Sequence, residues 1–205
     1  MKKNMPRTKE QCERIKEERK AAIKSAGLRL FAINGYKSVT IDDIMDEINS
    51  AHSLFYHYYP SKEELFHEIM CDIEGQMTEE FSGIYFERKA VIVLDELLER
   101  VLHMMKQAKG AYAIYILLTL YFQRENLPRR RGKEPKYNFW NVAHYLISKG
   151  QEEGDFFEGD VDQYCVAILA IIRGLAYKGM LEREFLLLPD KKIILNLVLK
   201  RKETD

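Results

Sequence analysis

Apolar residues recur at intervals of three and four along most of the chain, and this spacing constrains the fold more than any other feature. The series Ile23, Ala26, Leu30 and Ile33 is one example. Such spacing places apolar side chains on one face of an α-helix, whereas a half-buried strand needs strict alternation, which no segment sustains. The sequence therefore predicts an all-α protein of about nine helices.

Capping residues and helix breakers divide the periodic segments. Thr40 and Ser61 each precede an acidic residue by three positions, as in a capping box at a helix start. Gly35 and Pro60 mark helix ends. The expected helices span about 10–34, 41–47, 52–58, 62 to the low 80s, 90–107, 111–124, 136–152, 161–182 and 190–202.

Two of these helices are short and are joined by a tight turn at Asn49, a residue type that tolerates left-handed backbone. Ile44 and Ile48 give the first short helix an apolar face, and Phe55 and Tyr59 give one to the second. Two short helices around a tight turn form a helix-turn-helix, whose second helix can enter the major groove of DNA.

The distribution of charge agrees with an N-terminal DNA-binding part. Residues 1–62 carry 12 Lys and Arg against 8 Asp and Glu, whereas residues 63–205 carry 20 against 24. A basic segment joined to an acidic one is typical of a DNA-binding protein with a separate partner domain. We therefore expect a DNA-binding domain at 1–62, which includes an N-terminal arm, and a second helical domain at 63–205.

A specific combination of motifs runs without a gap from Ile23 to Leu65. It comprises Ala26, Leu30, Phe31, Gly35-Tyr36, Thr40-Ile41, Ile44, Phe55-Tyr56-His57-Tyr58-Tyr59 and Ser61-Lys62-Glu63-Glu64-Leu65. This stretch resembles the DNA-binding domain of the TetR family of bacterial transcriptional regulators. The resemblance implies a homodimer that binds double-stranded DNA, usually as a repressor, and leaves a palindromic operator when a small-molecule effector binds.

The resemblance also implies which side chains meet DNA. Residues expected to contact the DNA backbone are Thr40, Tyr56 and Lys62, and those expected to face base edges or nearby phosphates are His52, Ser53 and His57. Backbone contacts fix the position of the protein on the duplex, and base contacts supply specificity.

The chain departs from the family around the second short helix. The family usually has an apolar residue at Ser50, a Ser or Thr cap at Ala51, and a small or polar residue at Leu54. We expect Ser50 to take over the capping role, and Leu54 either to meet a thymine methyl group or to pack in the core. These departures leave a second hypothesis open. In it, the chain is a helical small-molecule-binding protein whose N-terminal domain, the DNA head, no longer recognises DNA sequence.

The middle helices are rich in aromatic residues and methionine, and in this family the space between them holds the ligand. Apolar walls with a few phenols suit a flat or amphipathic ligand. The candidate pocket residues are Phe81, Met104, Tyr112, Tyr115, Phe122, Trp140 and Arg173. For each of them an ordinary core position is the competing interpretation, and for Arg173 a guanidinium that reaches water.

The segments 161–182 and 190–202 are apolar around most of their circumference. Small residues at Ala167, Ala170 and Gly174 permit close approach of another helix. Helices without a clear polar face need burial on more than one side. In the family the last two helices pack across a two-fold axis, so we expect a homodimer through these segments, with burial inside one subunit as the alternative.

Other classes of function find no support in the sequence. It contains no nucleophile–base pair and no Gly-rich phosphate loop, so we expect no enzyme activity and no cofactor. The three cysteines and the histidines lack metal-ligand spacing, so we expect no metal. The N-terminus carries no apolar signal, and the apolar run at 110–123 is too short to span a bilayer. We therefore expect a cytoplasmic protein with no membrane partner.

Overall fold

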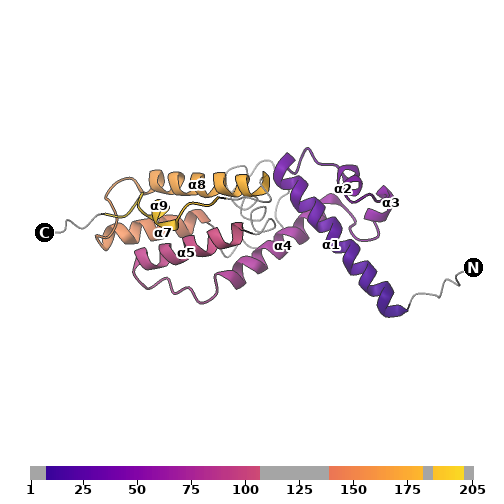
Figure 1. The fold of residues 1–205 in the computed structure, drawn as a ribbon, viewed down its shortest axis with the longest axis horizontal. Coiled ribbons are helices and arrows are strands. Elements are labelled where there is room, and N and C mark those ends of the chain that lie inside the picture. Colours follow the sequence, from indigo (N-terminus) through magenta and orange to yellow (C-terminus); the bar gives the residue numbers. More distant parts are fainter. Residues whose placement is uncertain (1–7, 107–138, 182–186, 201–205) are drawn as a thin grey trace, which may run out of the picture. The chain divides into compact units, whose positions relative to one another are not determined.

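A computed structural model of the chain describes residues 8–106, 139–181 and 187–200. These residues contain helices and no strand, which confirms the predicted all-α class. The helices are α1 (Lys9–Asn34), α2 (Ile41–Glu47), α3 (His52–Phe55), α4 (Lys62–Glu80), α5 (Ala90–Met105), α7 (Phe139–Glu152), α8 (Val161–Leu181) and α9 (Lys191–Leu195) (Figure 1). The helix expected at 111–124 lies outside the described residues.

The chain forms two compact units, residues 1–69 and 70–205. The boundary falls inside α4, which runs unbroken from Lys62 to Glu80 and so contributes to both units. The division of function between residues 1–62 and 63–205 stays a proposal. Among the described helices, none is long and apolar enough to cross a membrane.

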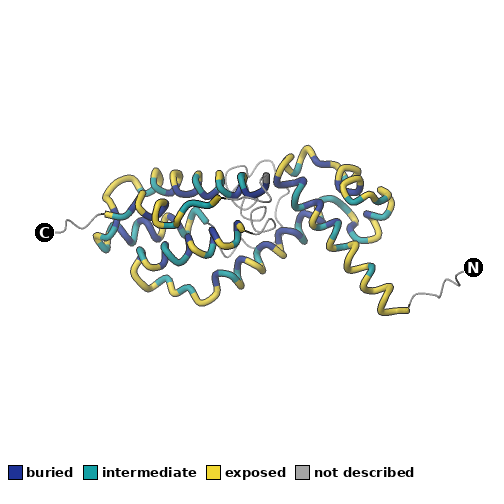
Figure 2. The backbone as a smooth tube through the Cα atoms, viewed as in Figure 1, coloured by how far each residue is buried: buried dark blue, intermediate teal, exposed yellow. Residues whose placement is uncertain are grey.

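The N-terminal unit is organised around the second half of α1. Phe31 on the buried face of this helix packs against Tyr36 and Phe66. The centroids of the three rings lie 5.0 to 5.7 Å apart. Gly27 allows α4 to come close, because a Cβ atom there would lie 3.0 Å from Cδ2 of Leu65. The first turns of α1, by contrast, are exposed (Figure 2).

The C-terminal unit is built on α5, α7 and α8, with α7 packed against both of the others and α9 packed on α5 (Figure 1). Its core is aliphatic, as the periodicity predicts: Leu98, Leu146, Ile147 and Ile168 are buried. The ammonium of Lys191 lies between Asp95, at 2.7 Å, and Glu99, which fastens the start of α9 to α5.

The prediction of a helix at 190–202 is wrong for its second half. Helix α9 ends at Leu195, residues 196–198 form a turn, and Leu199 forms an antiparallel bridge with Phe156. The N–H of Phe157 donates to the carbonyl of Val198 at 2.8 Å. The loop after α7 thus supplies the backbone partners that a continued helix would supply, while the turn still buries Val198. Val198 is therefore buried although the helix has ended before it.

Candidate DNA-binding surface and ligand cavity

Helices α2 and α3 form the predicted helix-turn-helix. Asn49 has a φ of 50°, the left-handed conformation that the turn needs, and the N–H of Ser50 donates to the carbonyl of Met45 at 2.9 Å. Ile44 and Phe55 are fully buried, which joins the two short helices through their apolar faces. The second helix ends at Phe55 rather than at 58, because residues 56–58 tighten into a turn.

The start of α3 has no side-chain cap. Its N-cap residue is Ala51, and the hydroxyl of Ser50 donates to the carbonyl of Ile48 at 3.3 Å instead of accepting from the first turn. The expectation that Ser50 takes over the capping role is therefore wrong. Ser50 lies one residue before the N-cap, and its hydroxyl turns back toward the preceding helix.

Most of the candidate DNA-contacting residues are on the surface of the N-terminal unit. Thr40, His52, Ser53, Tyr56 and His57 are exposed, with 53% of Tyr56 accessible to solvent. The ring of His52 lies 5.5 Å from that of Tyr56, so two of these side chains come together on α3 and the turn after it. Their contact with DNA stays a prediction.

Thr40 forms the predicted capping box at the start of α2. Its hydroxyl accepts the N–H of Asp43 at 3.1 Å, and its own N–H and hydroxyl both donate to Oδ2 of Asp43 at 2.7 Å. The N–H of Thr40, followed by its hydroxyl, holds the pKa of Asp43 below its ordinary value. The hydroxyl of Thr40 is thus engaged with Asp43 both as donor and as acceptor, so the main role of this side chain in the structure is to cap α2.

Lys62 is half-buried and joins the start of α4 to the loop between α1 and α2. Its ammonium donates to the carbonyls of Tyr36, at 2.9 Å, and Val39, at 2.6 Å, and lies 4.4 Å from the centre of the Tyr36 ring. Burial lowers the pKa of Lys62, while the charge of Asp43 acts in the opposite direction. An ammonium has three N–H groups, so the two carbonyl bonds are compatible with a phosphate contact by the third.

We expect Lys62→Met to loosen this loop as well as to weaken DNA binding. The variant leaves two carbonyls without their charged donor, which costs about 1–3 kcal/mol of local stability. Amide hydrogen exchange at residues 36–41 should become faster, and unfolding of the N-terminal unit should shift to lower urea. Lys16→Met, which removes an exposed cation of α1 in the same unit, is the control. Equal exchange rates in the two variants would contradict the structural role of Lys62.

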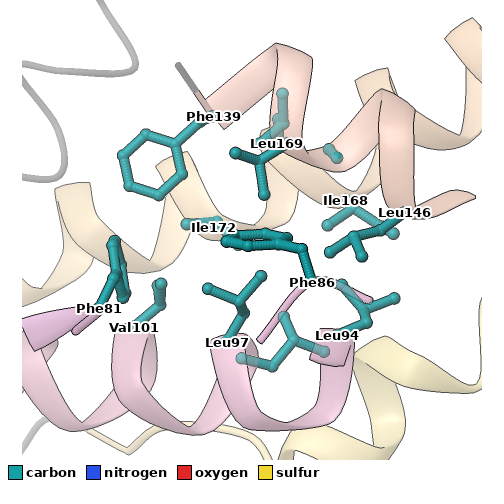
Figure 3. Close-up of a pocket in the computed structure, with 13 residues that line it drawn as sticks. Phe81, Phe86, Leu94, Leu97, Val101, Phe139, Leu146, Ile168, Leu169 and Ile172 are labelled. Atoms are coloured by element: carbon teal, nitrogen blue, oxygen red, sulfur yellow. The ribbon is translucent and has the colours of Figure 1, made fainter. Parts of the chain in front are cut away.

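An apolar cavity of about 50 Å³ lies within the C-terminal unit. Among the described residues, thirteen line it; they come from α5, α7, α8 and the segment between α4 and α5, and every one is apolar (Figure 3). They are Phe81, Phe86, Leu94, Leu97, Leu98, Val101, Phe139, Val142, Ala143, Leu146, Ile168, Leu169 and Ile172. Ligand pockets usually have several hundred cubic ångströms, so a ligand of ordinary size would have to move side chains.

Phe86 is the side chain best placed to move. Figure 3 shows its ring among the labelled residues, between Leu97 of α5 and the α8 residues Ile168 and Ile172. Phe86 lies in the segment between α4 and α5 and is half-buried. Displacement of the ring would therefore disturb a loop rather than a helix.

The predicted pocket residues are only partly in this cavity. Phe81 lines it, with its ring 6.4 Å from that of Phe139, whereas Met104, Trp140 and Arg173 are not among the lining residues. Tyr112, Tyr115 and Phe122 lie outside the described residues. Sequence reasoning missed Phe86, Leu97 and Ile172. The two aliphatic residues lie in apolar helical segments without a feature that sets them apart from core, and nothing in the local sequence distinguishes Phe86.

The chain's own residues offer no metal centre within the described segments, since no three His, Cys, Asp or Glu side chains there are grouped to hold an ion. Burial raises the pKa of the Cys165 thiol to about 11, which keeps that thiol protonated at neutral pH.

Comparison with known proteins agrees with this geometry. Residues 23–69, which contain the helix-turn-helix and the start of α4, match the profile of bacterial regulatory proteins of the tetR family. That family consists of regulators, in agreement with the expectation that the chain is not an enzyme. No curated protein matches the chain significantly.

Solved structures share the fold over most of the chain. A gamma-butyrolactone receptor, an ArpA-like protein, is 18% identical with a TM-score of 0.64, covering 90% of this chain and 89% of its own. The fatty acid degradation regulator FadR from Bacillus halodurans is 19% identical with a TM-score of 0.57, covering 88% and 94%. A tetR-family regulatory protein from Rhodococcus RHA1 is 16% identical with a TM-score of 0.56, covering 89% and 98%. Residues 23–69 are therefore similar to bacterial regulatory proteins of the tetR family, and the chain as a whole shares the all-helical fold of these solved structures.

Proposed function

We propose that the protein is a ligand-responsive transcriptional repressor that binds a palindromic operator as a homodimer. The helix-turn-helix carries this proposal: its apolar residues Phe55 and Tyr59 are buried, while His52, Ser53 and His57 are exposed on the same short segment. Polar side chains on the exposed side of such a helix are suited to base edges in the major groove.

The effector of this repressor is a small molecule with a substantial apolar part. The apolar lining that the described residues give the cavity supports this proposal, since buried apolar walls favour aliphatic or aromatic groups. Two proteins of the same fold agree with it by their names, a gamma-butyrolactone receptor and a fatty acid degradation regulator.

Helix α4 is the proposed link between effector and operator. Phe81, which directly follows the C-terminal end of α4, and Phe86, further along the same loop, both line the cavity. At the other end of the same helix, Lys62 holds the loop before α2. An effector that displaces Phe86 therefore disturbs the loop after α4, and through that loop it acts on the end of a helix that begins in the DNA-binding unit. Release requires that the effector bind the free form more tightly than the DNA-bound form.

The exposed face of α8 supports the proposed homodimer. Val166 and Tyr177 are 50% and 45% exposed, and the small residues Ala167, Ala170 and Gly174 are exposed beside them. An apolar surface of this kind with small residues at its centre suits close packing against a second copy of the same helix. In the 190–200 segment, Ile193 and Leu197 are also exposed.

We expect Phe86→Ala to create a binding site for a small apolar probe. The variant removes a ring that lines the cavity and so enlarges the empty space, and engineered cavities with Leu, Ile and Phe walls bind benzene. Benzene affinity, measured by calorimetry, should rise at least about tenfold over that of the parent protein. Phe157→Ala is the control, since Phe157 belongs to the same unit but does not line the cavity. Equal benzene affinity in both variants would show that Phe86 does not occupy ligand space.

The function is tested by selecting bound duplexes from a random DNA pool at physiological salt, with protein refolded free of co-purified ligand. Enrichment of a palindrome supports the repressor and supplies a probe for effectors that release it. The uncapped α3 and Leu54 motivate the second hypothesis, in which the head no longer recognises sequence. Binding without enrichment that disappears as salt rises would favour that hypothesis.

A further inference from the structure

The two helices of the helix-turn-helix are joined by a polar contact that sequence spacing does not suggest. Oδ1 of Asp42, in the first turn of α2, lies against Nδ1 of His52, the first residue of α3. The side chains are 68% and 48% exposed, so both remain accessible to a bound duplex. The contact therefore lies on the surface proposed to meet DNA, and involves one of the proposed base-recognition residues.

A carboxylate beside one ring nitrogen restricts the states of an imidazole. A carboxylate only accepts hydrogen bonds, so Nδ1 of His52 must carry a proton to face it. The neutral ring that satisfies this condition has a lone pair on Nε2. The other neutral tautomer would set the lone pair of Nδ1 against the negative oxygen, and is disfavoured. Asp42 thus determines whether Nε2 of the neutral ring accepts or donates.

We infer that Asp42 is a positioning residue for base recognition, which fixes the tautomer and direction of the His52 ring. Nε2 then accepts a hydrogen bond from an exocyclic amine of adenine or cytosine in the major groove, the donors that these bases present there. Guanine O6 and N7 are acceptors and are discriminated against by the neutral ring. This inference rests on the proposed function, since it needs a sequence-recognising head.

A purely mechanical role for the contact is the competing explanation. Ala51 provides no side-chain cap for α3, so the Asp42–His52 contact could serve only to fasten the start of that helix to α2. An exposed ion pair contributes little to stability in water. The two explanations separate if α3 is given a cap by another route. Ala51→Ser does this, because the backbone at Ala51 already has N-cap geometry, with φ of −70° and ψ of 141°.

The first experiment compares the bases selected from the random pool by the full-length parent protein and four variants. His52→Ala identifies the operator position that depends on the ring. We expect Asp42→Ala to lower the preference for adenine or cytosine at that position about threefold to tenfold, and Asp42→Ala with Ala51→Ser to leave it lowered. Asp46→Ala is the matched control, since it removes another exposed aspartate about one turn later on α2 and should leave the preference unchanged.

The second experiment measures the tautomer directly, by long-range proton–nitrogen correlation in protein with labelled histidine. The parent protein should show His52 protonated at Nδ1, and Asp42→Ala should shift the neutral ring toward protonation at Nε2. Restored base preference in the capped double variant, or Nε2 protonation of neutral His52 in the parent protein, would overturn the inference while the proposed function stands. Absence of any palindrome with the parent protein would overturn both.

Discussion

Gly150→Ala is expected to destabilise the C-terminal unit by about 1–3 kcal/mol, although it adds a single methyl group to a helix. A Cβ atom at Gly150 would lie 2.1 Å from Cδ2 and 2.3 Å from Cε2 of the Phe156 ring, far inside van der Waals contact. The ring is 1% exposed and cannot move into solvent. The N–H of Phe156 also donates to the carbonyl of Gly150 at 3.0 Å, so the two residues are held together by the backbone.

The strain should spread to the C-terminal segment. Phe156 pairs with Leu199, and displacement of its backbone would weaken the hydrogen bond from Phe157 to Val198. Urea unfolding at fixed protein concentration measures the loss, because any oligomer makes stability depend on concentration. Gly75→Ala is the control: Gly75 is also helical, has nothing within 4 Å of the added atom, and should gain up to about 1 kcal/mol. Equal stability of the two variants would contradict the packing of Phe156.

Features determined by local chemistry are those that the sequence predicts. Thr40 and Asp43 form the capping box because both partners lie within one turn of helix. Asn49 adopts the positive φ because the turn between two short helices demands it. Phe55 of α3 and Tyr59, which follows the turn after it, are both buried, as their spacing of four residues predicts. The match of residues 23–69 to the family covers this same region.

Features determined by tertiary packing escape sequence analysis. The expected helix at 190–202 stops at Leu195 because residues 155–157 supply backbone partners from elsewhere in the chain. Phe86 lines the cavity through the mutual packing of α5, α7 and α8, which the periodicity of each helix leaves undetermined. The residues Asp42 and His52 are ten positions apart and lie on either side of a turn, so the local sequence around neither residue predicts their contact.

The largest expected effect on operator binding comes from Val166→Lys on α8. If α8 packs against its copy across a two-fold axis, one substitution places two ammonium groups in the interface. Each ammonium would lose hydration without gaining a partner. We expect the dissociation constant of the dimer to rise at least about a hundredfold, or roughly 3 kcal/mol. Operator affinity should fall with it, since a dimer engages both half-sites at once.

Ile92→Lys on α5 is a closely matched control for this variant. Val166 and Ile92 are both β-branched, and they are 50% and 48% exposed, so lysine at either position should change the stability of the monomer by no more than about 0.5 kcal/mol. A difference in oligomeric state between the two variants then reports on the dimer interface alone. Sedimentation velocity should show Val166→Lys as a monomer at concentrations where Ile92→Lys and the parent protein are dimers. Dissociation of Ile92→Lys instead would place the dimer interface on α5. A fully dimeric Val166→Lys would exclude α8 from the interface. In a two-fold interface, neither subunit can bury the new charge without its partner burying the same charge.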